Sequence, residues 1–190
     1  MGWHGVQAEK EEEKSTVKRF VGIDPSTKLG LVVLDAAGRL LDAVEIAPKG
    51  QDPDRMIELI DRTIARLDHG DHIAIEGFGF ASQQAIQLGG IGWGLRMALR
   101  RKRMRYIEPT PNQVKKFSTD KGNADKNVIM REVYKRWGFE HDSDNVIDAF
   151  VLAQIAMAYY LPDVELTSFQ REVIEAIKNP PVKKSKKKAN

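Results

Sequence analysis

The chain has 190 residues, of which 42% are hydrophobic and 30% are charged, and its formal net charge is +3. These values are typical of one folded domain with its own core. No stretch approaches the roughly 18 apolar residues of a membrane span, and acidic residues 11–13 stand where a signal peptide would be basic and then apolar. The absence of cysteine excludes disulfides and thiolate zinc sites and suits the reducing cytoplasm.

The first predicted elements are strands. Residues 1–17 have no core pattern and are expected to be a disordered extension. Strands are predicted at residues 18–23, 30–34 and 39–46, and tight turns between them would make an antiparallel meander. A helix follows at residues 53–67, because its apolar residues recur at helical spacing, and Asp52 is its expected N-cap.

Strands and helices then alternate. A short buried strand is predicted at residues 72–75 and a fifth strand at residues 104–107. Between them lies a helix at 82–102, a prediction weakened by the four glycines Gly89, Gly90, Gly92 and Gly94. After the fifth strand come a short helix at 111–117, a polar loop at 118–124, and helices at 125–137 and 144–160.

The element order predicts an α/β fold with a mixed five-stranded sheet and helices on both faces. The strands at 18–23 and 72–75 should be neighbours in this sheet. We expect one domain at residues 18–165, then a C-terminal helix and a basic disordered tail at residues 166–190.

Positive charge is concentrated in two segments. Residues 96–116 hold eight Lys or Arg residues against the single acidic residue Glu108, and residues 183–188 hold five lysines. Such segments suggest a polyanionic partner, most simply nucleic acid. A solvated helix face and a solubilising tail would explain the same charges.

Three acidic residues in apolar surroundings are the candidates for chemistry. Asp24 ends the first apolar run, Glu76 follows the strand at 72–75, and Asp148 lies in an almost wholly apolar helix. Carboxylates in such places are unfavourable unless a cation compensates them. Oxygen ligands without cysteine favour Mg²⁺ or Mn²⁺. Two such ions, about 4 Å apart, can activate a water and stabilise the leaving 3′-oxygen in phosphodiester hydrolysis.

Each acidic residue also has a purely structural explanation. Asp24 could close an ordinary turn, and Glu76 could cap the helix that follows it. Asp144, which lies one helical turn before Asp148, could interact only with the helix dipole.

These residues belong to a series of short motifs in a fixed order. The motifs are Gly22-Ile23-Asp24-Pro25-Ser26, Ile75-Glu76, Gln87-Leu88-Gly89-Gly90, residues 109–116, residues 123–126 and Asp148-Ala149. Over about residues 20–158 the series resembles the RuvC-type Holliday junction resolvases of the ribonuclease H-like superfamily. The compact length suggests a phage or prophage member.

The resemblance implies a metal-dependent endonuclease that resolves four-way DNA junctions by paired symmetric nicks, leaving a 5′-phosphate and a 3′-hydroxyl. It implies Mg²⁺ as the cofactor, with Mn²⁺ as a substitute, and a two-fold homodimer. The glycine-rich helix at residues 88–99 is our prediction for part of the dimer interface. Branch-migration or phage replication proteins are candidate partners, and no membrane partner is expected.

The resemblance also assigns roles to individual residues. Asp24, Glu76 and Asp148 match the metal-binding carboxylates of the family. The fourth ligand of the family falls on Asn145 here, so Asp144, the Asn145 amide oxygen or a water could fill that place, and we prefer Asp144.

Basic and aromatic residues are assigned in the same way. Lys115 and Lys126 match two functional lysines, which would hold phosphates or stabilise developing charge. Phe78 or Phe80 would stack on a base at the branch point. Their structural alternatives are surface lysines and a hydrophobic plug against the sheet.

Three other functions are the alternatives. Another ribonuclease H-like nuclease would act on flaps, other branched DNA, single strands or RNA–DNA hybrids. A catalytically inactive relative would only bind junctions, an alternative that Asn145 raises. An actin-like kinase or ATPase would need a second glycine-rich phosphate loop and about twice this length, and the sequence has neither.

Overall fold

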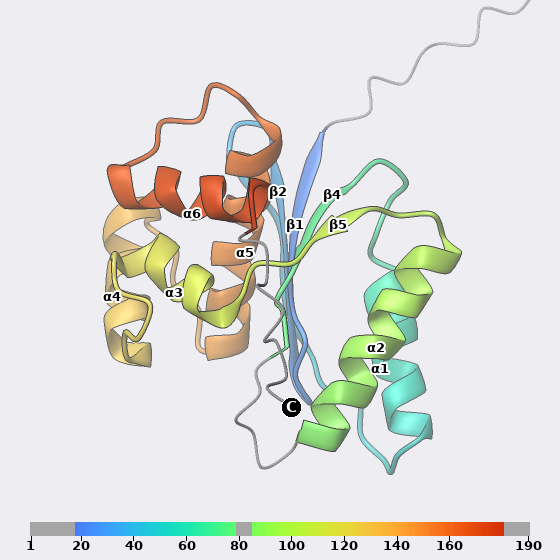
Figure 1. Ribbon diagram of the computed structural model, residues 1–190. Coiled ribbons are helices and arrows are strands. Elements are labelled where there is room, and N and C mark those ends of the chain that lie inside the picture. The colour runs from blue at the N-terminus through green and yellow to red at the C-terminus, as the bar shows by residue number, and fades with distance from the viewer. Residues whose placement is uncertain (1–17, 79–84, 181–190) are drawn as a thin grey trace, which may run out of the picture.

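The central strands carry apolar side chains on both faces, so the sheet must be covered on both sides. The computed structural model describes residues 18–78 and 85–180 (Figure 1). In β1 (Arg19–Asp24), Phe20 faces one hydrophobic core while Val21 and Ile23 face the other. Both cores are built from buried apolar side chains.

Five strands form one mixed sheet in the order β3-β2-β1-β4-β5. The first three, β1, β2 (Leu29–Asp35) and β3 (Leu40–Ile46), form an antiparallel meander. The next two, β4 (His72–Ile75) and β5 (Tyr106–Ile107), run parallel to β1. The predicted fold class, and the predicted pairing of the first strand with the fourth, are therefore confirmed.

Helices cover the sheet on both sides (Figure 1). On one side lie α1 (Asp54–Ile64) and α2 (Ala85–Arg101). On the other side α5 (Asp144–Tyr160) lies against the strands, and α3 (Pro111–Thr119), α4 (Lys126–Trp137) and α6 (Ser168–Lys178) pack around it. In the described part of the chain, no helix is long and apolar enough to cross a membrane.

Two glycines let α5 contact the sheet backbone directly. A Cβ atom on Gly22 would lie 1.9 Å from the carbonyl oxygen of Ala149, and one on Gly30 would lie 1.9 Å from that of Asn145. No side chain fits in such a gap, so glycine is required at both positions. The first two turns of α5 are thereby held beside the end of β1 that carries Asp24.

Several predicted boundaries are wrong, each for a local reason. Asp52 does not cap α1, because its carboxylate accepts hydrogen bonds from Arg55 (2.9 Å) and Gln87 (2.7 Å), and the N-cap position is Pro53. The prediction starts the polar loop two residues too early, since Ser118 and Thr119 donate to the carbonyl of Lys115 and extend α3.

Other elements are shorter than predicted. The helix predicted at 53–67 ends at Ile64. The fifth strand has only two residues, because the amide of Met104, at its predicted start, donates to the carbonyl of Leu99 at 3.0 Å and closes the end of α2. The C-terminal helix α6 packs into the α5 core through Val173 and Ile174, and Gln170 donates to the carbonyl of Phe117 at 3.3 Å. The domain boundary at residues 165–166 stays a prediction.

Candidate active site

Asp24 and Glu76 lie side by side at one edge of the sheet. They follow Ile23 and Ile75, which are paired in the parallel register of β1 and β4. The Glu76 amide continues this ladder and donates to the carbonyl of Ile23 at 3.0 Å. Asp24 is only 7% exposed. The two strands thus bring together carboxylates that are far apart in the sequence.

Asp148 reaches the same place from α5. It lies one residue before Ala149, whose carbonyl faces Gly22 of β1. The negative charges of Glu76 and Asp148 both contribute to the raised pKa of Asp24. The structure therefore brings the three predicted carboxylates into one cluster, with one residue from β1, one directly after β4 and one from α5.

All three carboxyl groups hold their protons more tightly than usual. Burial, followed by the charges of Glu76 and Asp148, raises the pKa of Asp24 well above its ordinary value. Burial and the charge of Asp148 raise the pKa of Glu76 to about 7, and chiefly burial raises that of Asp148 to about 6. Near neutral pH, ionisation of the cluster is opposed by desolvation and by like-charge repulsion.

The two predicted lysines lie next to this cluster. Lys115 of α3 lowers the pKa of Glu76 and of Asp148, and Lys126, the first residue of α4, lowers that of Asp24 and of Asp148. Their positive charges therefore act on the carboxylates, which a lysine on an unrelated surface would not do.

The residues at the start of α5 point in different directions. Asp144 accepts a hydrogen bond from Lys126 Nζ at 2.7 Å, and its charge contributes to the raised pKa of Asp148. The Asn145 amide instead lies 3.5 Å from the carboxylate of Glu45 on β3, which also accepts from Ser143. This arrangement favours Asp144 over Asn145 as an additional ligand. The sequence does not indicate Glu45, whose role depends on contacts across about a hundred positions.

The donor set fits a hard divalent cation. Its atoms are carboxylate oxygens, which Mg²⁺ and Mn²⁺ prefer, and a cation would relieve the repulsion that raises the three pKa values. Among residues 18–78 and 85–180, no three Asp, Glu or His side chains are already in a ligating arrangement. Binding an ion therefore requires the carboxylate side chains to turn toward one another.

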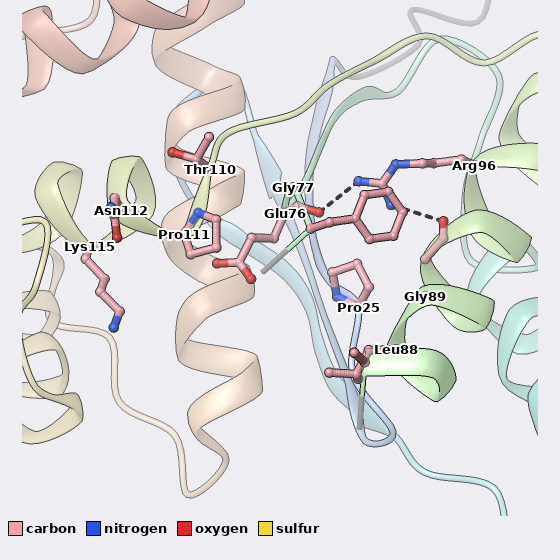
Figure 2. Close-up of a pocket in the computed structure, with 13 residues that line it drawn as sticks. Pro25, Glu76, Gly77, Leu88, Gly89, Arg96, Thr110, Pro111, Asn112 and Lys115 are labelled. Carbon is pink, nitrogen blue, oxygen red and sulfur yellow. Dashed lines mark hydrogen bonds between the residues drawn. The ribbon is translucent and has the colours of Figure 1, made fainter. Parts of the chain in front are cut away.

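A cavity of about 680 Å³ opens beside Glu76, between α2 and α3. Figure 2 shows Glu76 near the centre of this cavity, with Lys115 on the α3 side and Arg96 on the α2 side. Pro25, Leu88 and Asn112 also line it. In the sequence these residues stand out only as members of short motifs. Nothing in the sequence indicates that they line one cavity, because a cavity between distant elements leaves no local pattern.

Phe78, two residues after Glu76, packs on α2. The centre of its ring lies 5.3 Å from the centre of the Trp93 ring, and the guanidinium of Arg96 lies 4.3 Å from the centre of the Phe78 ring. The structural alternative placed this ring against the sheet, whereas it lies against a helix. Phe80 lies outside the described residues, so the choice between the two aromatics stays open.

One basic residue is not where its charge suggests. Arg96 is the first member of the basic segment at residues 96–116, yet it is only 3% exposed and contacts the main chain of Glu76. The alternative of a solvated helix face is therefore wrong for Arg96, and Arg96 and Lys115 of the same segment both line the cavity.

Comparison with known proteins identifies a matching family. The family model described as crossover junction endodeoxyribonuclease RuvC matches residues 20–156. The protein of that name from Campylobacter hominis is 29% identical over 147 residues, which cover 71% of this chain and 92% of the relative. The one from a Synechococcus species is 29% identical over 149 residues, covering 71% and 95%.

Solved structures share the fold. Thermus thermophilus RuvC has a TM-score of 0.59 at 23% identity, over 71% of this chain and 90% of that one. T. thermophilus RuvC in complex with Holliday junction substrate has a TM-score of 0.58 at 22% identity, over 72% and 90%.

Proposed function

Since the chain belongs to the family of the crossover junction endodeoxyribonuclease RuvC, we propose that it cuts four-way DNA junctions at the cluster of Asp24, Glu76 and Asp148. The family makes it a hydrolase of DNA recombination and repair, and a metal-dependent nuclease that resolves Holliday junctions. Because its substrate is DNA, we propose that it acts in the cytoplasm.

The observation that supports this site best is the convergence of the three carboxylates beside two lysines. Asp24 ends β1, Glu76 directly follows the adjacent parallel strand β4, and Asp148 raises the pKa of both. Lys115 and Lys126 are close enough to lower pKa values within the cluster. Such a group can hold cations and a phosphodiester backbone at the same place.

We assign the metal ligands to Asp24, Glu76 and Asp148, with Asp144 as the additional carboxylate, and we propose Mg²⁺ as the ion, with Mn²⁺ as a substitute. When bound, such ions activate the attacking water and neutralise charge on the phosphate and the leaving oxygen. Lys115, which lines the cavity with Glu76, would orient the phosphate of the cut strand. Lys126 would exchange its bond to Asp144 for a phosphate oxygen.

Two coordinated cuts require two active sites, so we propose a homodimer. Large apolar side chains on α2 support a contact there, since Ile86 is 94% exposed, Trp93 59% and Met97 50%. Exposed apolar residues gathered on one helix are typical of a protein interface. Proteins of branch migration or phage replication are the proposed further partners.

The decisive experiment compares substrates of equal length and sequence. Four-way junctions, flaps, linear duplexes and RNA–DNA hybrids are incubated with the wild type and with Asp24→Asn, in Mg²⁺ and in Mn²⁺. We expect paired nicks in the junction, with 5′-phosphate and 3′-hydroxyl ends, from the wild type only. Preferential cutting of flaps or hybrids would contradict the assigned substrate, and cutting by Asp24→Asn would contradict the assigned site.

A further inference from the structure

Arg96 is an unusual residue to find inside helix α2. Its side chain is 3% exposed, and its guanidinium contacts several groups at once. Nη2 donates to the carbonyl of Glu76 at 3.0 Å (Figure 2), and Nη1 donates to the carbonyl of Gly92 at 3.0 Å. Nε donates to the carboxylate of Glu108. The guanidinium also lies 4.3 Å from the centre of the Phe78 ring.

Stability of the core does not account for these contacts. A buried ion pair is often no more stabilising than apolar residues of the same volume, because both charges must be desolvated. The partner, Glu108, is 46% exposed and only partly shares that penalty. What arginine adds is a planar fork that serves several acceptors in fixed directions. Two of the groups that Arg96 contacts, the Glu76 carbonyl and the Phe78 ring, belong to residues 76–78, the segment that carries the proposed metal ligand Glu76.

The main chain of this segment is held from three sides. The Glu76 amide donates to Ile23 of β1, and the Gly77 amide donates to Pro109 at 2.8 Å. Arg96 holds the carbonyl of Glu76 from α2. With both flanking peptides held, the direction in which the Glu76 side chain leaves the backbone is restricted.

Gly92 makes this arrangement possible. A Cβ atom at that position would lie 2.6 Å from Cε1 of Phe78 and 3.3 Å from Nη1 of Arg96. Glycine disfavours the helix by up to about 1 kcal/mol relative to alanine. Its absent side chain leaves the space that the Phe78 ring occupies over the guanidinium. This gives one of the four glycines in α2 a local function at the active site.

We propose that Arg96 is a positioning residue, which fixes the main chain of Glu76 and the ring of Phe78 against α2 and so directs the Glu76 carboxylate toward the metal and substrate. The proposal rests on the nuclease function proposed above. It makes α2 part of the catalytic apparatus as well as the proposed dimer contact.

The test compares Arg96→Lys and Arg96→Met with the wild type. Lysine keeps the charge but lacks the fork, so both variants should be impaired. A displacement of about 1 Å can lower turnover by about 100-fold, and we expect a loss of about 10- to 100-fold in kcat on junctions. Junction affinity, measured in Ca²⁺, should change less than about 3-fold, because Arg96 is only 3% exposed and its guanidinium donates to protein groups.

Metal binding without DNA supplies a readout independent of cleavage. Calorimetric titration with Mn²⁺ should show about 10-fold weaker binding per folded molecule in both variants, since a misdirected Glu76 is a poorer ligand. A merely structural arginine would lower the unfolding temperature and the folded fraction without changing this affinity. Arg62→Met, on the exposed side of α1, is the control and should match the wild type in every measurement.

A second variant covers the case in which Arg96 cannot be replaced without unfolding. Gly92→Ala favours the helix but pushes the Phe78 ring away from Arg96. It should weaken Mn²⁺ binding and lower kcat without lowering the folded fraction. Gly89→Ala adds the same methyl group in the same helix, meets nothing within 4 Å, and should keep the Mn²⁺ affinity of the wild type.

The two proposals fail in different ways. Junction cleavage by Asp24→Asn would overturn the proposed active site as a whole. Cleavage that requires Asp24, together with wild-type kcat and Mn²⁺ affinity in folded Arg96→Lys, Arg96→Met and Gly92→Ala, would overturn the role of Arg96 alone.

Discussion

Asp24 is the most buried member of the carboxylate cluster, and its replacement separates chemistry from binding. Asp24→Asn keeps the size of the side chain but removes a charge that a metal ion needs. We expect cleavage to fall by about 1,000-fold or more, as losses of essential catalytic groups do, with junction affinity within about 3-fold of the wild type. Gel-shift assays in Ca²⁺ and single-turnover cleavage in Mg²⁺ measure the two effects. Wild-type turnover would contradict the assignment.

The raised pKa values of Glu76 and Asp148 predict a pH-dependent stability for the metal-free protein. The pKa of Glu76 is about 7 against an ordinary 4.5, and that of Asp148 about 6 against 3.8. The folded state therefore binds these protons more tightly than the unfolded state. Their contribution to stability is present at low pH and is lost as pH rises through about 6 to 7.

Glu76→Gln tests this linkage directly. At pH 8 the variant should be more stable than the metal-free wild type by about 1–2 kcal/mol. The difference should vanish near pH 4, and saturating Mn²⁺ should reverse it. Urea unfolding at several pH values in EDTA gives the measurement. A variant that is less stable at pH 8 in EDTA would show that Glu76 is not repelled in the folded protein.

Lys126 lies beside the carboxylate cluster, where we expect it to bind a phosphate of the DNA backbone. Lys126→Ala removes the hydrogen bond to Asp144 and one positive charge near Asp24 and Asp148. Activity should fall, and the slope of log affinity against log salt concentration should become shallower by about 0.9, the value for one phosphate contact. Lys121→Ala, at an exposed position of the preceding loop, should leave the slope unchanged. An unchanged slope in Lys126→Ala would mark this lysine as a surface residue.

At the scale of elements, the site depends on how closely α5 approaches β1. Gly22→Ala would place a methyl group 1.9 Å from the carbonyl of Ala149, so the helix must move away from the strand. We expect a loss of stability of about 3 kcal/mol or more, at the upper end for overpacked cores. Because Asp148 moves with α5, Mn²⁺ affinity should fall as well. Thermal unfolding and Mn²⁺ titration measure both, and a wild-type unfolding temperature would contradict the contact.

The elements also show which parts of the sequence are informative. The predicted bounds of β4 and α5, residues 72–75 and 144–160, agree with the structure, because each segment is strongly apolar and has clear ends. Asp71 and Glu76 flank β4, and α5 begins after Ser143 and ends shortly before Pro162. The predicted cap of α1 and the start of the loop after α3 are wrong. In both places a short polar side chain could bind several partners. Asp52 accepts from Arg55 and Gln87 and does not cap the helix, and Ser118 and Thr119 donate to the carbonyl of Lys115 and so lengthen α3.

For the whole molecule, the main prediction concerns assembly through α2. Met97→Lys places a charge on the exposed apolar side of this helix. We expect a shift from dimer to monomer in sedimentation, and loss of paired nicks in a cruciform plasmid while single nicks persist. Leu41→Lys, at an exposed apolar position on the edge strand β3, is the control and should remain dimeric. A dimeric Met97→Lys with paired nicks would place the interface elsewhere.

The sequence alone indicated the three carboxylates, because a charged residue at the end of an apolar run is locally conspicuous and its energetic penalty can be judged without a fold. It also indicated the sheet, since alternating strand and helix patterns allow few arrangements. Only the tertiary structure showed that Arg96 binds the carbonyl of Glu76 and that Asn145 lies toward Glu45. It also showed that α5 packs against the glycines of β1 and β2. These contacts join residues distant along the chain, and close packing in three dimensions decides them.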